Sequence, residues 1–435
     1  MPIARAPCRL PLRLAAAVLG ATLAATGCGT QGPTTAPSGA TPSVTPGGTA
    51  GPPTPAASGP PGSGVDSSAV YASIRADVIA IRGLQPSKAV DPVTIDATQL
   101  RSNLESEFDT ENPPAQLKAS EDLLIALGLL PAGASLKQIT LDFQAGQVAG
   151  YYSPEKDELF VVSRSGQLGA AELVTYAHEF THQLQDQRID LGKLGIDVPD
   201  QSDRSLARLA VVEGDAVSVQ TAWMLANLDS EQLGELLASA LDPKALAALQ
   251  NAPAFVRETA LFPYQDGVAF VTRLKGSADY AAIDAVYAAP PDSTEQILHP
   301  EKYLAREQPI QVSLPANLAS VAGAGWSEAG RDTLGELILR IWLTAGGVPA
   351  AQAKIATAGW GGDRVALLRG PGGATGLGIQ TTWDTATDAD EFAAAATTAF
   401  AALALAGSVQ HAAGSSTVSI AIGPTSAQLL AALGD

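Results

Sequence analysis

Two histidines and a glutamate in this chain stand at a spacing that can hold a metal ion and use it. The segment 175–184 reads TYAHEFTHQL and contains the pattern His-Glu-x-x-His. Residues four apart on a helix lie one above the other, so His178 and His182 can direct ring nitrogens at one point. Zinc binds such imidazole pairs, and Glu179 beside it can act as a general base toward water. The segment therefore predicts a zinc-dependent peptidase.

The residues around this motif favour a buried helix. An exposed helix that carries two histidines by chance would have Lys, Arg or Glu at the flanking positions. Positions 176, 177, 180, 181 and 183 are instead uncharged, and Leu184 is apolar. The chain has only four histidines in 435 residues, and two of them fall in the motif. Composition alone therefore does not account for the pairing.

A catalytic zinc site needs a third protein ligand and one open position, and Glu213 is the candidate. It lies in a second expected helix, which begins near Ser202 or Asp203. Apolar residues stand three, four or seven positions away from it: Leu206, Leu209, Ala210, Ala216 and Val217. A carboxylate on an apolar stripe is costly unless it is paired or binds a metal. Either zinc binds Glu213, or a cation such as Arg208 pairs with it.

A His-Glu-x-x-His motif followed by a glutamate on a downstream helix resembles the gluzincin group of metallopeptidases. The resemblance covers residues 147–220 and implies that His178, His182 and Glu213 bind one catalytic zinc ion, with Glu179 as general base. The spacing from His182 to Glu213 is longer than in thermolysin-like members. Many gluzincins also carry an Asp four residues after the ligand Glu, where this chain has Val217.

A ligand histidine usually donates its second ring N–H to a carboxylate or a carbonyl. Two carboxylates are candidates for this partner. Asp186 lies one turn beyond His182 on the same helix face, and Asp215 lies two residues after Glu213.

Further segments extend the likeness. Residues 262–267 (FPYQDG) and 293–303 (STEQILHPEKY), together with the motif and residues 213–216 (EGDA), resemble a little-characterised set of bacterial exported metallopeptidases across most of 67–400. This resemblance implies the zinc site and supplies no substrate. Gluzincins often add a His or Tyr that donates a hydrogen bond to the developing oxyanion. The candidates are His299, Tyr303 and Tyr264, and each has a structural role as its alternative.

The elements that must position these residues indicate an α+β fold. Helical spacing predicts helices over 67–83, 96–107 and 116–129, a strand over 138–143, and a hairpin with strands within 147–152 and 158–162. The motif helix begins near 170. In thermolysin-like peptidases, a strand just before this helix forms the cleft rim, and substrate pairs with it. We therefore expect a zincin-like domain over 67–315, with a small mixed sheet, an edge hairpin and the active-site helices.

The C-terminal third reads as a small, mainly helical α/β lobe over 316–435. Its pattern predicts helices over 333–343 and 388–405, with strands over 365–368, 378–383 and 417–422. No catalytic constellation is evident in it.

The N-terminus resembles a bacterial lipoprotein signal. Arg5, Arg9 and Arg13 precede a short apolar run over 14–24, and small residues lead to Cys28. We expect a signal peptide over 1–27 and diacylation of Cys28, although Ala25 replaces the usual large aliphatic residue. The alternatives are an ordinary signal peptide and an uncleaved anchor. Residues 28–66 are Gly, Pro, Ser, Thr and Ala-rich, as in an extended tether. The protein is then exported and anchored at the outer face of the cell membrane.

Composition restricts the partners. Asp plus Glu is 44 against 26 for Lys plus Arg, which argues against nucleic acid and anionic membrane surfaces. The two cysteines, Cys8 and Cys28, lie before the folded part and leave no Cys-based zinc site there. We expect a membrane-tethered zinc endopeptidase that acts on peptide or protein substrates. The alternative is a catalytically silent, zinc-binding envelope scaffold, which would have no need of Glu179.

Overall fold

The computed structural model describes residues 67–434 except 89, 164–167, 242 and 277–278. The predicted signal peptide, Cys28 and the tether lie outside the described residues. In the part of the chain that is described, no helix is both long enough and apolar enough to span a membrane.

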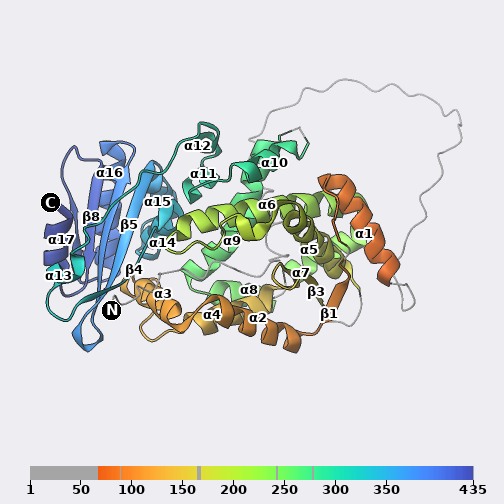
Figure 1. The fold of residues 1–435 in the computed structure, drawn as a ribbon, viewed down its shortest axis with the longest axis horizontal. Coiled ribbons are helices and arrows are strands. Elements are labelled where there is room, and N and C mark those ends of the chain that lie inside the picture. The colour runs from red at the N-terminus through yellow and green to blue at the C-terminus, as the bar shows by residue number, and fades with distance from the viewer. Residues whose placement is uncertain (1–66, 89, 164–167, 242, 277–278, 435) are drawn as a thin grey trace, which may run out of the picture.

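The first two thirds of the described chain are mainly helical (Figure 1). The elements are α1 (Ser67–Arg82), β1 (Pro92–Ile95), α2 (Ala97–Glu111), α3 (Pro114–Ala126), α4 (Leu136–Gln147), β2 (Gly150–Ser153), β3 (Glu158–Val162), α5 (Ala170–Ile189), η1 (Leu191–Lys193), α6 (Ser202–Asn227), α7 (Ser230–Ala240), α8 (Pro243–Asn251), α9 (Ala254–Lys275), α10 (Ala281–Ala288), α11 (Thr294–Leu298) and α12 (Pro300–Leu304).

A small mixed sheet stands before the motif helix, in the order β1-β3-β2. The strands β2 and β3 form the predicted hairpin, and β1, which the sequence pattern missed, pairs with β3 in parallel. The strand directly before α5 is therefore central and paired on both sides. The edge of the sheet nearer the motif is β2, the first strand of the hairpin. The cleft rim that was expected of the strand directly before α5 is therefore formed by β2 and not by β3.

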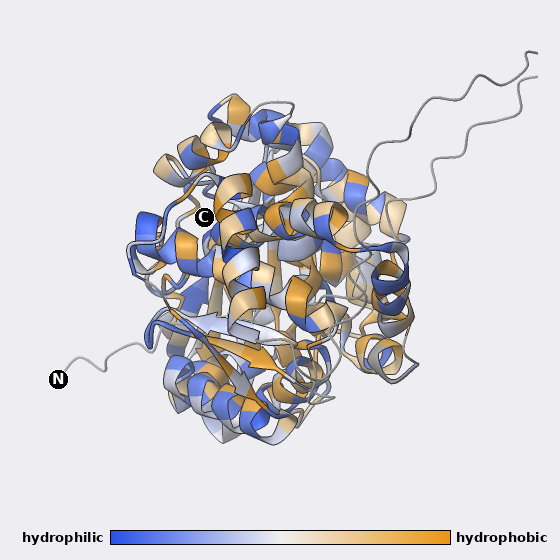
Figure 2. Cartoon of the chain, turned by 90° about the vertical axis from the view of Figure 1, so that its right-hand side faces the viewer, coloured by the Kyte–Doolittle hydropathy of each residue, from blue (hydrophilic) through white to orange (hydrophobic). Residues whose placement is uncertain are grey.

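Helices cover both faces of this sheet because its strands alternate two apolar sets of side chains. In β3, Phe160 and Val162 pack against α2 and α4, whereas Leu159 and Val161 belong to the core formed with α1 and α5. Figure 2 shows the apolar strands enclosed between helices. The side chains of β2 and β3 are thus buried except Glu158, whereas β1 exposes Val93 and Thr94.

The strand predicted over 138–143 is wrong, because this segment lies within the helix α4. The alternation of Ile139, Leu141 and Phe143 suggested a strand. Ser135 caps the helix by accepting from the backbone N–H of Gln138. The buried residues of α4 include Leu136, Thr140 and Phe143, which follow helical spacing. Leu141, on another side of the helix, packs with Phe160 and Val162 of the small sheet, so tertiary packing decides in favour of the helix.

The C-terminal part is built on a five-stranded antiparallel sheet in the order β4-β5-β6-β8-β7. Its elements are α13 (Leu318–Ala322), β4 (Ser327–Asp332), α14 (Gly335–Ala345), α15 (Ala350–Thr357), β5 (Trp360–Arg369), η2 (Pro371–Gly373), β6 (Thr375–Trp383), α16 (Ala386–Ala402), β7 (Gly407–His411), β8 (Thr417–Ile422) and α17 (Ser426–Gly434). The predicted helices and strands of this part match α14, α16, β5, β6 and β8, while β4 and β7 were missed.

The two parts share one apolar core. Side chains of α14 and α16 and one face of the large sheet continue the core that surrounds α5 and α6. The helices α13 and α17 cover the opposite face. In Figure 1 the C-terminal part, in blue, lies beside the helical part at one end of the molecule. The boundary predicted near 316 marks a change of architecture within continuous packing.

Buried carboxylates join the C-terminal part to the helix that carries Glu213. Asp332, at the end of β4, accepts hydrogen bonds from the backbone N–H and the hydroxyl of Ser202, the first residue of α6 (2.9 and 2.5 Å). Asp203 accepts from the backbone N–H and hydroxyl of Thr294. The start of α6 is therefore fixed by groups far away in the sequence.

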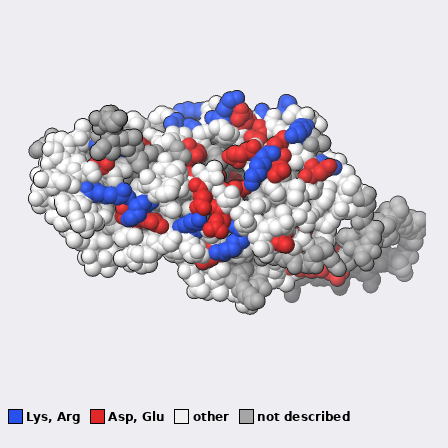
Figure 3. All heavy atoms as spheres, turned by 60° about the horizontal axis from the view of Figure 1, so that its bottom comes forward, with Lys and Arg blue, Asp and Glu red and all other residues white. Residues whose placement is uncertain are grey.

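Charged side chains on the surface lie in mixed groups with uncharged areas between them, as Figure 3 shows for one face. Ion pairs such as Lys137 with Asp109 (2.7 Å) and Lys156 with Glu107 (2.8 Å) are typical of the described surface. Exposed pairs of this kind add little to stability because solvent screens them. The fold therefore depends mainly on its apolar core.

Candidate metal centre

The motif lies on a helix that is buried along most of its length. In α5, His178 and Glu179 have no exposed surface and His182 is 6% exposed. Gly169 caps the start of the helix, where its backbone N–H donates to Glu172 (3.0 Å), and Asp190 follows the last helical residue in a left-handed conformation. The small sheet, α1 and α6 enclose its middle. This burial excludes the exposed helix considered above.

Three potential ligand atoms meet between α5 and α6. The Nε2 atoms of His178 and His182 lie 3.0 Å apart, and each lies 3.2 Å from Oε2 of Glu213. Tetrahedral zinc with bonds of 2.0–2.1 Å requires ligand atoms about 3.3 Å apart. The spacing therefore fits a zinc ion, and the donor set of two imidazoles and one carboxylate is one that catalytic zinc uses.

The carboxylate of Glu213 and the imidazole of His182 stabilise each other's charged forms. Burial raises the pKa of Glu213, but His182 and His178 outweigh it and lower that pKa to about 2. Burial lowers the pKa of His182, and Glu213 outweighs it and raises that pKa to about 9. In the metal-free protein, Glu213 is thus a carboxylate beside a protonated imidazole, whose place a divalent cation can take. The partner is not Arg208, which binds Asp292 (2.8 Å).

Glu179 lies one residue along the helix from His178 and has open hydrogen-bonding capacity. Among the described residues no side chain bonds to its carboxylate oxygens, and the backbone N–H of Tyr152 on β2 is near enough to lower its pKa. Burial raises its pKa, and the two histidines oppose that shift. A Cβ on Gly150 would lie 3.6 Å from Cγ of Glu179. Glu179 therefore lies against the edge strand β2, where it can take up a proton.

A cleft opens beside this centre, between β2 and α6. Its walls come from α2, α4, β2 with its turn, the η1 region and α6. They comprise Leu104, Glu107, Phe108, Glu111, Gln144, Tyr151, Tyr152, Ser153, Pro154, Glu155, His182, Leu191, Gly192, Ile196, Leu209, Val212 and Glu213. A concave and mostly apolar site with a few polar groups is typical of ligand-binding clefts.

Tyr264 is the one oxyanion candidate whose ring lies beside the motif in the described structure. It comes from α9, and its ring centroid lies 6.2 Å from that of His178 at an interplanar angle of 28°. Val217 packs against it. The second ring nitrogen of His178, Nδ1, has no hydrogen-bond partner among the described residues.

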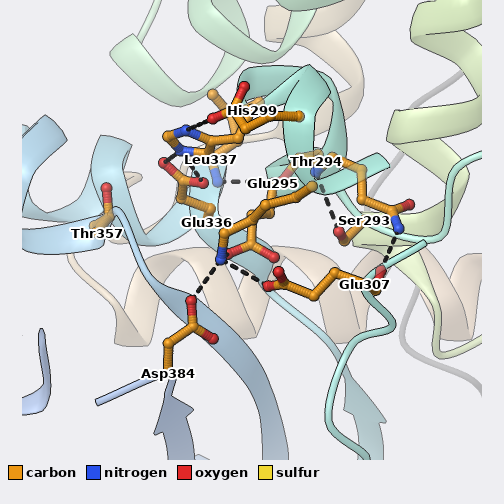
Figure 4. Close-up of polar contacts among 12 residues, drawn as sticks. Ser293, Thr294, Glu295, His299, Glu307, Glu336, Leu337, Thr357 and Asp384 are labelled. Atoms are coloured by element: carbon orange, nitrogen blue, oxygen red, sulfur yellow. Dashed lines mark hydrogen bonds and ion pairs between the residues drawn. The ribbon is translucent and has the colours of Figure 1, made fainter. Parts of the chain in front are cut away.

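His299 and Tyr303 have other partners. Nε2 of His299 lies 3.0 Å from Glu336, and the hydroxyl of Tyr303 donates to the carbonyl of Ala289 (2.8 Å). Figure 4 shows the ring of His299 turned toward Glu336. Neither residue lines the cleft beside the motif, and neither does Tyr264, so the partners of His299 and Tyr303 are what set them apart. Their polar atoms therefore have structural roles here.

A second group of carboxylates could suggest a metal site near His299. Glu295, Glu307 and Asp384 bring oxygen atoms close together, as Figure 4 shows. The ammonium group of Lys302 lies 2.6, 2.8 and 2.5 Å from them. A lysine cation thus occupies the middle of this cluster and offsets part of its negative charge.

The two carboxylates considered as partners of a ligand histidine have different positions. Asp186 accepts from the hydroxyl of Tyr152 (3.1 Å) and so ties α5 to the edge strand. Asp215 reaches the site through Gln185. Nδ1 of His182 lies 2.8 Å from Oε1 of Gln185, whose Nε2 donates to Asp215 (3.0 Å). Sequence reasoning missed Gln185, although a polar residue three positions after His182 on a buried helix could have indicated it.

Comparison with known proteins adds one match. A family model described as a domain of unknown function (DUF8575) matches residues 321–431. This stretch lies in the C-terminal part and does not include the motif. No curated protein and no solved structure matches the chain.

Proposed function

We propose that this chain is an exported zinc-dependent peptidase whose first part, residues 67–315, is zincin-like. The observation that carries the proposal is the meeting of His178, His182 and Glu213, with ligand atoms 3.0–3.2 Å apart. Glu179 adds a buried carboxylate next to them. This combination is what metal-assisted hydrolysis of a peptide bond requires.

The residues of the site have three roles in the proposed reaction: metal binding, proton transfer and oxyanion binding. Zinc, when bound by the three ligands, would polarise the attacking water and the scissile carbonyl. Glu179 accepts a proton from the water and transfers it to the leaving amine nitrogen. Its burial raises its pKa, which suits a group that holds a proton between two steps. We assign to Tyr264, which stacks on His178, the hydrogen bond to the developing oxyanion.

The substrate class follows from the cleft. An extended peptide can add a strand to the edge of β2, whose only sheet partner among the described strands is β3. Apolar side chains of η1, the following loop and α6 form the wall next to Glu213: Leu191, Ile196, Leu209 and Val212. We therefore propose extended peptide or protein substrates with an apolar side chain near the scissile bond.

The location rests on the N-terminal sequence. A lipid on Cys28 and the tether that follows would hold the enzyme at the outer face of the cell membrane. Replacement of Cys28 with Ala is expected to move the protein from the membrane fraction to the soluble fraction. An unchanged distribution would mean that the apolar run over 14–24 holds the protein at the membrane without the lipid.

The activity is tested on the purified full chain. Zinc content is measured by mass spectrometry, and cleavage of casein and of a peptide library is followed. The matched control is Glu179→Gln, which keeps the size of the side chain and cannot take the proton. Stoichiometric zinc with cleavage that depends on Glu179 is expected. Zinc without cleavage would favour the silent scaffold, and a folded chain without zinc would overturn both functions.

A further inference from the structure

We infer that Gln185 is a positioning residue that sets the tautomer and ring orientation of His182, and that Asp215 and Arg82 orient Gln185 in turn. The inference rests on the proposed zinc site and adds to it a neutral amide where a carboxylate or backbone carbonyl is usual.

The orientation of the Gln185 amide follows from its partners. Its Nε2 atom lies 3.0 Å from the carbonyl oxygen of Val212 and 3.0 Å from Oδ2 of Asp215. A backbone carbonyl oxygen only accepts hydrogen bonds, so the NH₂ group must face Val212, and the same nitrogen donates to Asp215. Oε1 of Gln185 then necessarily faces Nδ1 of His182, at 2.8 Å. Gln185 has no exposed surface, so water does not offer an alternative arrangement.

The amide orientation fixes the tautomer of His182. Because Oε1 of Gln185 can only accept, Nδ1 of His182 must carry the hydrogen. In the neutral ring, Nε2 then has the free lone pair and points toward Glu213 and His178. This is the form of imidazole that binds a metal.

A buried ion pair keeps Asp215 in place. The guanidinium Nε of Arg82 and the hydroxyl of Tyr287 both lie 3.0 Å from Oδ2 of Asp215. Arg82 also donates to Asp284 (2.7 Å) and lies over the ring of Tyr280, at 5.0 Å. The side chains of Arg82 and Asp215 are fully buried.

The same contacts link three helices at the metal centre. Arg82 is the last residue of α1, Gln185 lies on α5, and Val212 precedes Glu213 on α6. Gln185 therefore bonds to one ligand and to the backbone next to another. It sets the spacing between His182 and Glu213 as well as the direction of the imidazole.

Zinc affinity of the full chain tests this role. Competition with a chromophoric chelator gives the dissociation constant. Gln185→Leu removes the acceptor at His182, and a 10- to 100-fold weaker zinc affinity is expected. Gln185→Glu keeps an acceptor at His182 but sets its second oxygen against Asp215 and the carbonyl of Val212, so a zinc affinity below that of wild type is expected there too. The matched control is Gln183→Leu, since Gln183 is an equally buried amide on α5 that bonds to the carbonyl of Lys88. The control should stay within about threefold of wild type, because it leaves His182 untouched.

A spectroscopic measurement on the wild type keeps the inference testable even if Gln185→Leu does not fold. With ¹⁵N-labelled histidine, the zinc-loaded protein has only four imidazoles to assign. A proton on Nδ1 of His182 and zinc on Nε2 are expected. Zinc on Nδ1, an unchanged affinity in Gln185→Leu, or an equal loss in Gln183→Leu would overturn the inference and leave the peptidase proposal intact. A wild-type chain that binds no zinc would overturn both.

Discussion

Gly214 on α6 and Gly267 on α9 meet backbone to backbone where the two helices cross. A Cβ on Gly214 would overlap the carbonyl group of Gly267, and a Cβ on Gly267 would overlap the carbonyl oxygen of Ala210. The contact places Glu213, the residue before Gly214, beside the helix that carries Tyr264. The crossing of these helices therefore sets the distance between the third ligand and the tyrosine at the site.

Gly214→Ala is expected to destabilise the protein by about 1–3 kcal/mol, because the added methyl group forces the helices apart. Chemical denaturation measures this change. Gly234 on α7 is the matched control, since a Cβ there would have no atom within 4 Å. Gly234→Ala should be neutral or stabilising by up to about 1 kcal/mol through helix propensity. Equal effects of the two changes would contradict the role of the crossing.

Local pattern predicted which side chains would meet, because the candidate ligands depend on helical periodicity. The spacing of His178 and His182 and the apolar stripe around Glu213 are both properties of a single helix. The role of Gln185 was missed because it depends on Asp215 and Val212, which only the packing of α6 against α5 brings near. A pattern within one segment carries no such information.

The errors in the fold have the same origin. The apolar alternation in 138–143 is compatible with a strand, and only its contact with the sheet makes it the helix α4. The four residues of β1 are too few for a periodic signal. His299 was a candidate because of its residue type, but its place beside Glu336 depends on how α14 packs against α11.

Glu179→Gln should lower kcat by at least 10²-fold and leave the zinc content unchanged, because Glu179 moves the proton and does not bind the metal. Steady-state kinetics and metal analysis on the same sample measure both effects. His182→Ala is the complementary change and should lose zinc as well as activity. Loss of zinc in Glu179→Gln would assign Glu179 to the metal rather than to proton transfer.

Tyr264→Phe should lower kcat by about 10²-fold with little change in KM, because an oxyanion donor acts mainly on the transition state. Tyr303→Phe is the control. Its hydroxyl donates to the carbonyl of Ala289, so its loss should cost about 1 kcal/mol of stability and leave kcat unchanged. If only Tyr303→Phe lowers kcat, Tyr303 rather than Tyr264 is the oxyanion donor.

The buried carboxyl group of Asp332 should make stability depend on pH. Burial raises its pKa to about 7, although Ser202 and the backbone N–H of Thr333 oppose that shift. Its pKa in the unfolded chain lies near 3.9. Between these values the folded protein binds the additional proton, so this contribution to stability is present at low pH and declines as the pH rises toward 7.

Asp332→Asn isolates this contribution, since the amide does not titrate. The unfolding free energy of the wild type minus that of Asp332→Asn is expected to fall between pH 4 and pH 7 and to stay constant above it. Urea denaturation at several pH values measures the difference. A difference that grows over this range would mean that the carboxylate, bonded to Ser202 at the start of α6, is stabilised in its charged form.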